Sequence, residues 1–160
     1  MTEIDRYIEH CISRVPQERA SDFDPKLGIV KKPSQYLSLL LLPQLSGSKS
    51  IYGEKDLYML IVTATIHKFE CISGITVNRM NASLITIYAL LMLLKAFDEE
   101  HYTNINHVWA DALSMDLDSF NRLEAIFLFK AKGLLCIPTY EESMHFIEDF
   151  KAFQTTSSQP

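Results

Sequence analysis

Residues 90–128 read LLMLLKAFDEEHYTNINHVWADALSMDLDSFNRLEAIFL, and this stretch decides the fold. It begins in the last turns of an apolar segment that ends at Lys95, passes through an acidic break, and reaches Glu124 inside a later amphipathic segment. Apolar residues recur at helical spacing on both sides of the break, and no strand-like alternation interrupts them. The stretch therefore predicts two or more helices of an all-α domain.

The residues before this stretch predict two further helical segments. From Glu54 the apolar side chains fall on one face until Ser73-Gly74 interrupts the pattern; they are Leu57, Leu60, Ile61, Ala64 and Thr65. Asn78 or Asn81 is suited to cap the next helix, which runs to about Phe97 and is apolar almost all round. That pattern is typical of a helix enclosed by others, so we expect the second helix to be the hub of a bundle.

Three helices are predicted after the acidic break. The first covers about 104–113, and the next starts at a cap provided by Asp116 or Asp118. It runs to Lys132, where Gly133 provides a C-terminal stop. The last helix is expected to begin near Pro138, because proline suits a first helical turn.

The N-terminal part predicts one more helix and a connection. The stripe formed by Ile4, Tyr7, Ile8, Cys11, Ile12 and Val15 is amphipathic, and Pro16 ends it. Residues 17–33 are expected to be extended, and 36–42 to form one or two helical turns. We divide the chain into an N-terminal helix with its connecting segment (1–53), a helical domain (54–152) and a disordered tail (153–160). The N-terminal stripe either packs back on the helical domain or contacts a partner.

Length and charge narrow the classes of function. The chain of 160 residues fits one domain and carries a net charge of −5. An acidic protein is poorly suited to neutralise phosphates, so nucleic acid is not expected as a partner. The longest charge-free apolar stretch, 80–94, is too short to span a bilayer, which argues against a membrane protein. Three scattered cysteines and an acidic N-terminus favour a reducing compartment, cytoplasmic or nuclear.

No catalytic or metal motif stands out. The chain lacks a Gly-x-Ser-x-Gly elbow, a glycine-rich phosphate loop and a His-Glu-x-x-His helix, so no enzyme, metal site or cofactor is expected. Residues 98–101 (DEEH) with His107 could be drawn as a metal site or as paired carboxylates, but adjacent loop carboxylates are usually just hydrated. Trp109 is expected to lie in the core, because large aromatic side chains dominate burial.

The segment that joins Lys95 to Glu124 resembles the P-type cyclins of the phosphate-signalling branch. The resemblance is carried by the acidic break at 98–100, by Tyr102-Thr103-Asn104, by Trp109-Ala110 and by Asn121-Arg122-Leu123-Glu124, in that order. It covers about 54–149. The resemblance implies a five-helix cyclin box with an extra N-terminal helix.

The resemblance also implies a function in kinase regulation and the cell cycle. Cyclins of this kind bind a cyclin-dependent kinase, a protein Ser/Thr kinase, and hold its C-helix in the active position. The matching lysine and glutamate hydrogen-bond kinase main-chain groups, which assigns Lys95 as donor and Glu124 as acceptor. The apolar part of the interface is expected from Phe127, Leu128 and Leu135.

Departures from the family pattern leave alternatives open. Leu93-Leu94 replace two small residues, Ala112-Leu113-Ser114 replace a Gly-Gly turn, and Ser83-Leu84 replace a His-Arg pair. A helical adaptor that keeps the cyclin architecture without binding a kinase is the second hypothesis. A nucleic-acid-binding cyclin-like domain of the general transcription-factor kind is the third, and the acidic charge disfavours it. Taken alone, Lys95 could also simply favour the negative end of its helix, and Glu124 could be a solvated residue or an internal partner of Arg122 or of Lys95.

Overall fold

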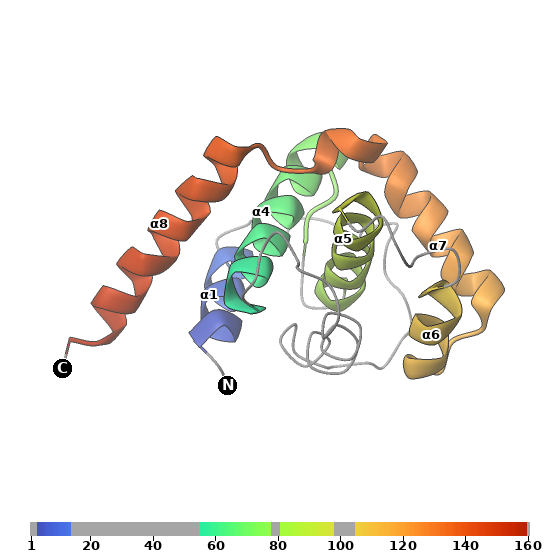
Figure 1. Ribbon diagram of the computed structural model, residues 1–160, viewed down its shortest axis with the longest axis horizontal. Helices are drawn as coiled ribbons and strands as arrows, with labels where there is room; N and C mark the ends of the chain where they lie inside the picture. Colours follow the sequence, from blue (N-terminus) through green and yellow to red (C-terminus); the bar gives the residue numbers. More distant parts are fainter. Residues whose placement is uncertain (1–2, 14–54, 78–80, 98–104, 160) are drawn as a thin grey trace.

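A computed structural model describes residues 3–13, 55–77, 81–97 and 105–159 of the protein. The described residues form six α-helices and one 3-10 helix and contain no strand, which confirms the all-α class (Figure 1). The helices are α1 (Glu3–Ser13), α4 (Lys55–Ser73), α5 (Ala82–Phe97), α6 (Ile105–Ala112), α7 (Leu117–Lys130) and α8 (Tyr140–Ser157), with η2 (Gly133–Cys136) between the last two.

The centre of the fold is the pair α4 and α5. Every described α5 residue from Leu84 to Leu94 is buried, as expected for a helix that is apolar all round. In α4, however, the buried residues run without a break from Met59 to Ile66, so the predicted one-sided stripe is wrong. The reason is that α4 lies against α1, α5, α7 and α8, which surround it. Among the described elements, α4 is thus at least as much a hub as α5.

The expected helix boundaries between α4 and α5 are largely confirmed. Gly74 follows the last residue of α4 with φ +70°, a left-handed conformation that glycine adopts at low cost. Beyond it, the Val77 N–H donates to Glu70 Oε1 at 2.9 Å. Burial raises the pKa of Glu70, and the Val77 hydrogen bond opposes that rise. Asn81 precedes α5 and donates from Nδ2 to the Thr76 carbonyl at 3.1 Å, so it ties the turn together.

Helix α7 begins at the cap the sequence predicted. Asp116 accepts the Ser119 N–H at 2.8 Å, and this hydrogen bonding with Ser119 lowers the pKa of the Asp116 carboxyl. The C-terminal end differs from the expectation, because the helix ends at Lys130. Lys132 is already left-handed with φ +54°, and Gly133 opens η2 instead of serving as the immediate stop.

Helix α8 starts later and ends later than predicted. Its cap is Thr139, one residue after Pro138, in a capping box with Glu142. The helix continues to Ser157, so the tail predicted for 153–160 is wrong over most of its length. Contacts with α1 explain the extension: Phe153 lies 5.6 Å from the Tyr7 ring, and Gln154 Nε2 donates to Glu3 Oε2 at 3.0 Å.

These contacts also decide between the two roles considered for the N-terminal helix. Tyr7 and Cys11 are buried in the same hydrophobic core as α4 and α5, and Tyr7 meets Phe150 edge-on at 5.4 Å. Helix α1 therefore packs back on the helical domain, against α4 and α8. The predicted connection at 17–33, the predicted turns at 36–42, Asn78 and the acidic break at 98–104 lie outside the described residues.

Candidate functional site

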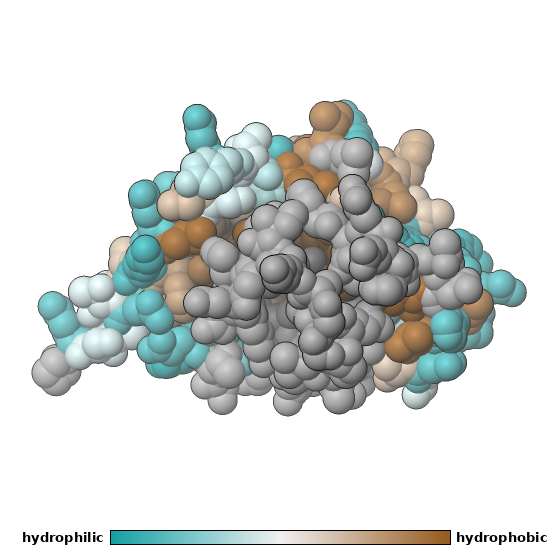
Figure 2. Space-filling model, in the orientation of Figure 1, coloured by the Kyte–Doolittle hydropathy of each residue, from teal (hydrophilic) through white to brown (hydrophobic). Residues whose placement is uncertain are grey.

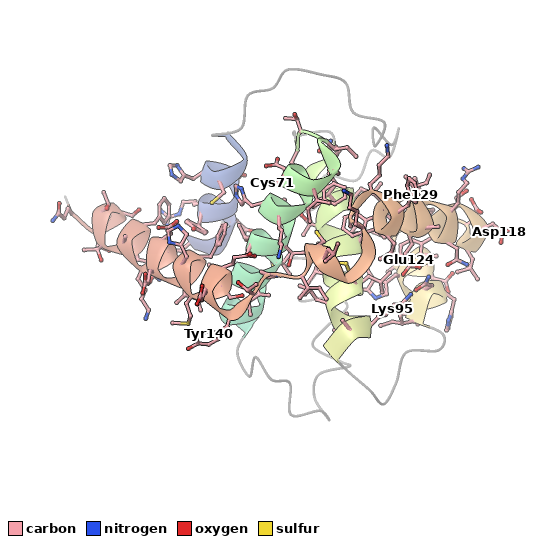
Figure 3. All side chains as sticks on the ribbon, turned by 90° about the horizontal axis from the view of Figure 1, so that it is seen from above. Cys71, Lys95, Asp118, Glu124, Phe129 and Tyr140 are labelled. Carbon is pink, nitrogen blue, oxygen red and sulfur yellow. The ribbon has the colours of Figure 1, made fainter. Side chains whose placement is uncertain are left out.

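Lys95 and Glu124 meet at the surface between α5 and α7. Lys95 lies in the last turn of α5, Glu124 lies in the middle of α7, and Lys95 Nζ is 2.6 Å from Glu124 Oε1 (Figure 3). The Lys95 side chain is 33% exposed and the Glu124 side chain 13% exposed. Two charged groups that are distant in sequence thus form one ion pair that is accessible to solvent on one side.

A third helix holds the second oxygen of this carboxylate. Asn106 of α6 donates from Nδ2 to Glu124 Oε2 at 2.5 Å and to Asn121 Oδ1 at 2.7 Å. We call Lys95, Asn106, Asn121 and Glu124 the polar cluster. It connects α5, α6 and α7, so it fixes the position of the carboxylate relative to all three helices.

Two buried polar atoms of α6 have no hydrogen-bond partner among the described residues. They are Asn106 Oδ1, which belongs to the polar cluster, and Trp109 Nε1. Trp109 has no exposed surface, which confirms its predicted place in the core. The sequence gives no signal for Asn106, because an isolated asparagine in a short helix matches no functional motif.

Tyr88 is a buried residue of α5 that links this helix to α7 near the polar cluster. Its hydroxyl donates to the Phe120 carbonyl at 3.0 Å, and its ring lies 5.2 Å from the Phe120 ring and 5.9 Å from the Phe127 ring. Burial raises the pKa of Tyr88 well above its ordinary value, and the negative charge of Glu124 raises it further. The phenol is therefore neutral at physiological pH, and it anchors α7 to α5.

The three apolar candidates differ in their exposure. Phe127 has no exposed surface and stacks on Phe69 at 4.6 Å, so it belongs to the core and cannot contact a partner in this structure. Leu128 is partly buried against the core, and Leu135 is 65% exposed on η2. Of the three, Leu135 presents the largest surface to a partner. The spacing of Phe120, Leu123 and Phe127 at i, i+3 and i+7 already indicates a core-facing stripe.

The most exposed large apolar side chain among the described residues was not predicted. Phe129 is 82% exposed on α7, and Ile126, one turn earlier, is 38% exposed. Phe129 is five positions after Glu124, which places the two side chains roughly 140° apart around the helix. Figure 3 shows the two on different sides of α7. Phe129 thus lies on a different side of the helix from the polar cluster.

The remaining sequence candidates give no chemical centre in the described part of the chain. His107 is exposed on α6, and the acidic residues at 98–101 lie outside the described residues. Within the described ranges, no group of three or more His, Cys, Asp or Glu side chains is placed to hold a metal ion. In the same ranges, no helix is both long enough and apolar enough to cross a bilayer.

Comparisons with protein-family models, with curated proteins and with solved structures find no match to this chain. Its function is therefore inferred from the sequence motifs and from the geometry of the polar cluster.

Proposed function

We propose that the protein is a single-box cyclin that binds a cyclin-dependent kinase and activates it by holding the kinase C-helix in the active position. In this proposal α4 to α8 form the cyclin box and α1 is the extra N-terminal helix. The observation that carries the proposal is the 2.6 Å pairing of Lys95 with Glu124 at the surface. These are the two positions that the resemblance to P-type cyclins assigns to kinase binding.

The polar cluster retains hydrogen-bonding capacity for a partner. An ammonium group has three donors and a carboxylate has about four acceptor positions. Lys95 makes one hydrogen bond with the described residues, and the two Glu124 oxygens accept one each. The main chain of a kinase can therefore add a carbonyl at Lys95 and an N–H at Glu124 without breaking the internal ion pair.

An apolar contact beside the polar cluster would come from η2 and the end of α7. Leu135 is exposed, and Leu128 is partly exposed one turn after Glu124. A few well-packed side chains usually carry most of the affinity of an interface, while the polar pairs fix the register. We assign Leu135 as the main apolar anchor and the partly exposed Leu128 as a second contact, whereas Phe127 has no exposed surface and lies outside the interface.

Such binding can switch a kinase on without chemistry from this chain. A kinase needs its β3 lysine paired with its C-helix glutamate, and a subunit that prefers this arrangement shifts the population toward it. Converting a mostly inactive population to a mostly active one takes about 5.5 kcal/mol of differential affinity. An interface of standard size, roughly 1,600 Å², is compatible with affinities of this order.

The test compares two double variants of the full chain. Lys95→Ala with Glu124→Ala should no longer retain a cyclin-dependent kinase from native lysate, identified by mass spectrometry, and its eluate should not phosphorylate histone H1. Glu148→Ala with Lys151→Ala on α8 removes the same charges from exposed positions and should behave as wild type. Equal kinase retention by both double variants would refute the proposed site.

The second candidate function is a helical adaptor with cyclin architecture that binds no kinase. The observation that favours it is that Lys95 and Asn106 already engage both oxygens of Glu124. In that case the polar cluster only joins three helices. Wild-type protein would then retain no cyclin-dependent kinase, and its eluate would lack kinase activity.

A further inference from the structure

The outer face of α7 combines an exposed aromatic ring with charges of both signs. Asp118, Arg122, Ala125 and Phe129 are all exposed, and they lie within about 60° of one another around the helix. Lys132, two residues past the end of α7, is exposed as well. Phe129 is 82% exposed and lies in the half of the face nearer to Lys132. We call these five residues the α7 face.

The α7 face is separate from the polar cluster. In Figure 1, α7 forms one edge of the fold, and no described helix lies on its outer side. Figure 3 shows Asp118 and Phe129 near opposite ends of α7, with Glu124 on a different side of the helix from Phe129. Figure 2 shows hydrophobic and hydrophilic residues interleaved on the α6 and α7 side of the molecule. The face therefore offers both apolar and charged contacts, and it includes neither Lys95 nor Glu124.

The charged side chains of the α7 face are available to a partner. Asp118, Arg122 and Lys132 form no ion pair with the residues that the structure describes. Arg122 acts on Asp116 only through its charge, which contributes to the lowered pKa of that carboxyl. Asp118 and Lys132 are fourteen positions apart, about 21 Å along a helix, so they cannot pair within one chain.

The order of these residues makes the α7 face complementary to a second copy of itself. Asp118 lies seven positions before Ala125, and Lys132 lies seven positions after it. Arg122 lies three positions before Ala125, and Phe129 lies four positions after it. An antiparallel contact centred on Ala125 thus places Asp118 of each copy opposite Lys132 of the other. In the same register, Arg122 of each copy faces Phe129 of the other.

This register brings together groups that attract one another. A guanidinium is attracted to the face of an aromatic ring, and it stacks there more often than an ammonium group does. The small side chain of Ala125 at the crossing point lets the two helix axes approach closely. Ile126, beside Ala125 and 38% exposed, adds apolar area. Because the contact has two-fold symmetry, each of these interactions occurs twice.

We propose that two copies of this protein form a two-fold symmetric dimer through their α7 faces, with the two α7 helices antiparallel. The pairs of Asp118 with Lys132 set the register and direction of the contact, and the packing of Phe129 against Arg122 provides most of the affinity. The dimer goes beyond kinase activation and does not depend on it, because its interface contains no residue of the polar cluster.

The test measures the association state of the full chain by sedimentation velocity, from about 5 to about 500 µM protein in about 0.15 M salt. A reversible monomer–dimer equilibrium is expected, with Kd on the order of 10–100 µM, because a single pair of helices buries less surface than a tight dimer. A protein that stays monomeric over the whole range would overturn the proposal and leave the α7 face to a different partner.

Charge reversal tests the register. Phe129→Ala removes two rings from the dimer and should weaken it at least tenfold. Asp118→Lys places lysines opposite each other in both halves of the contact and should weaken the dimer about tenfold. Adding Lys132→Asp reverses both pairs and should restore Kd to within about threefold of wild type. Aspartate is among the residues that tolerate the left-handed conformation of Lys132, φ +54°.

A matched control reverses two charges outside the α7 face. Glu148→Lys with Lys151→Glu changes exposed residues of α8 and should leave the dimer Kd within about twofold of wild type. Far-UV circular dichroism checks that each variant keeps its helices. An unchanged Kd for Phe129→Ala would overturn the proposed interface. A double reversal of Asp118 and Lys132 that dimerises no better than Asp118→Lys alone would overturn the antiparallel register.

Discussion

The Tyr88 hydroxyl donates to the Phe120 carbonyl at 3.0 Å and so links the middle of α5 to the first turns of α7. The two rings also lie 5.2 Å apart. Because Glu124 is one helical turn after Phe120, the same link fixes the position of the Glu124 carboxylate relative to Lys95. The partly exposed ion pair is therefore positioned by a buried hydrogen bond between the same two helices.

Tyr88→Phe should cost about 1 kcal/mol of unfolding free energy at neutral pH, the usual net value of one buried hydrogen bond. The difference from wild type should shrink as pH rises above 10. The pKa of Tyr88 is 10.0 in its ordinary state and is raised in the folded protein, so its contribution is complete below pH 10 and is lost above it. Urea unfolding of both proteins at a series of pH values measures this. A difference that stays constant above pH 10 would contradict the assigned shift.

Phe127 and Phe129 lie two residues apart in α7 but face core and solvent, respectively. Phe127→Ala should lose about 3–5 kcal/mol, because it leaves a cavity beside Phe69 and Tyr88. Phe129→Ala should stay within about 0.5 kcal/mol of wild type, because its side chain is 82% exposed. Chemical denaturation compares the two variants directly. Similar losses of unfolding free energy for both variants would mean that α7 is rotated about its axis, so that Phe127 does not face the core.

Phe127 also shows the limit of the sequence prediction. A resemblance indicates which positions matter in a family, but the face of a helix that a residue occupies is set by packing. The Phe120, Leu123 and Phe127 spacing indicates burial of Phe127, and for this residue the spacing is a better guide than the resemblance. Lys95 and Glu124, by contrast, could be predicted as a pair, because the motif relates them directly.

Other features of the fold could not be predicted because they depend on contacts between residues far apart in the sequence. The helical pattern predicted each described helix, but not that α4 is buried without a break from Met59 to Ile66, which depends on where α1 and α8 pack. The end of α8 is stabilised by Phe153 against Tyr7 and by Gln154 with Glu3, contacts between opposite ends of the chain. No local pattern reveals such pairs. For the same reason, the Asn106 contact with Glu124 could not be predicted.

The ion pair between Lys95 and Glu124 should contribute little to the free energy of unfolding. A double-mutant cycle with Lys95→Ala and Glu124→Ala should give a coupling free energy of about 0.5–1 kcal/mol that decreases with added salt, since the pair is partly exposed. The unfolding free energy of the double variant, measured in the same cycle, shows whether it remains folded, and in a folded double variant a loss of kinase binding reports on the interface. A coupling above about 3 kcal/mol would instead mark a buried structural pair and favour the adaptor hypothesis.

The three cysteines should differ in reactivity, because only Cys71 is exposed. Cys136 is buried on η2, and its thiol donates to the Thr65 carbonyl at 3.5 Å. Burial raises the pKa of the Cys136 thiol to about 12, so almost no thiolate is present at pH 8. Brief treatment with iodoacetamide at that pH, followed by peptide mapping, should label Cys71 and leave Cys11 and Cys136 unmodified until urea unfolds the chain. Cys71→Ser should then abolish native labelling, whereas fast labelling of Cys136 in the folded protein would contradict the packing of η2 on α4.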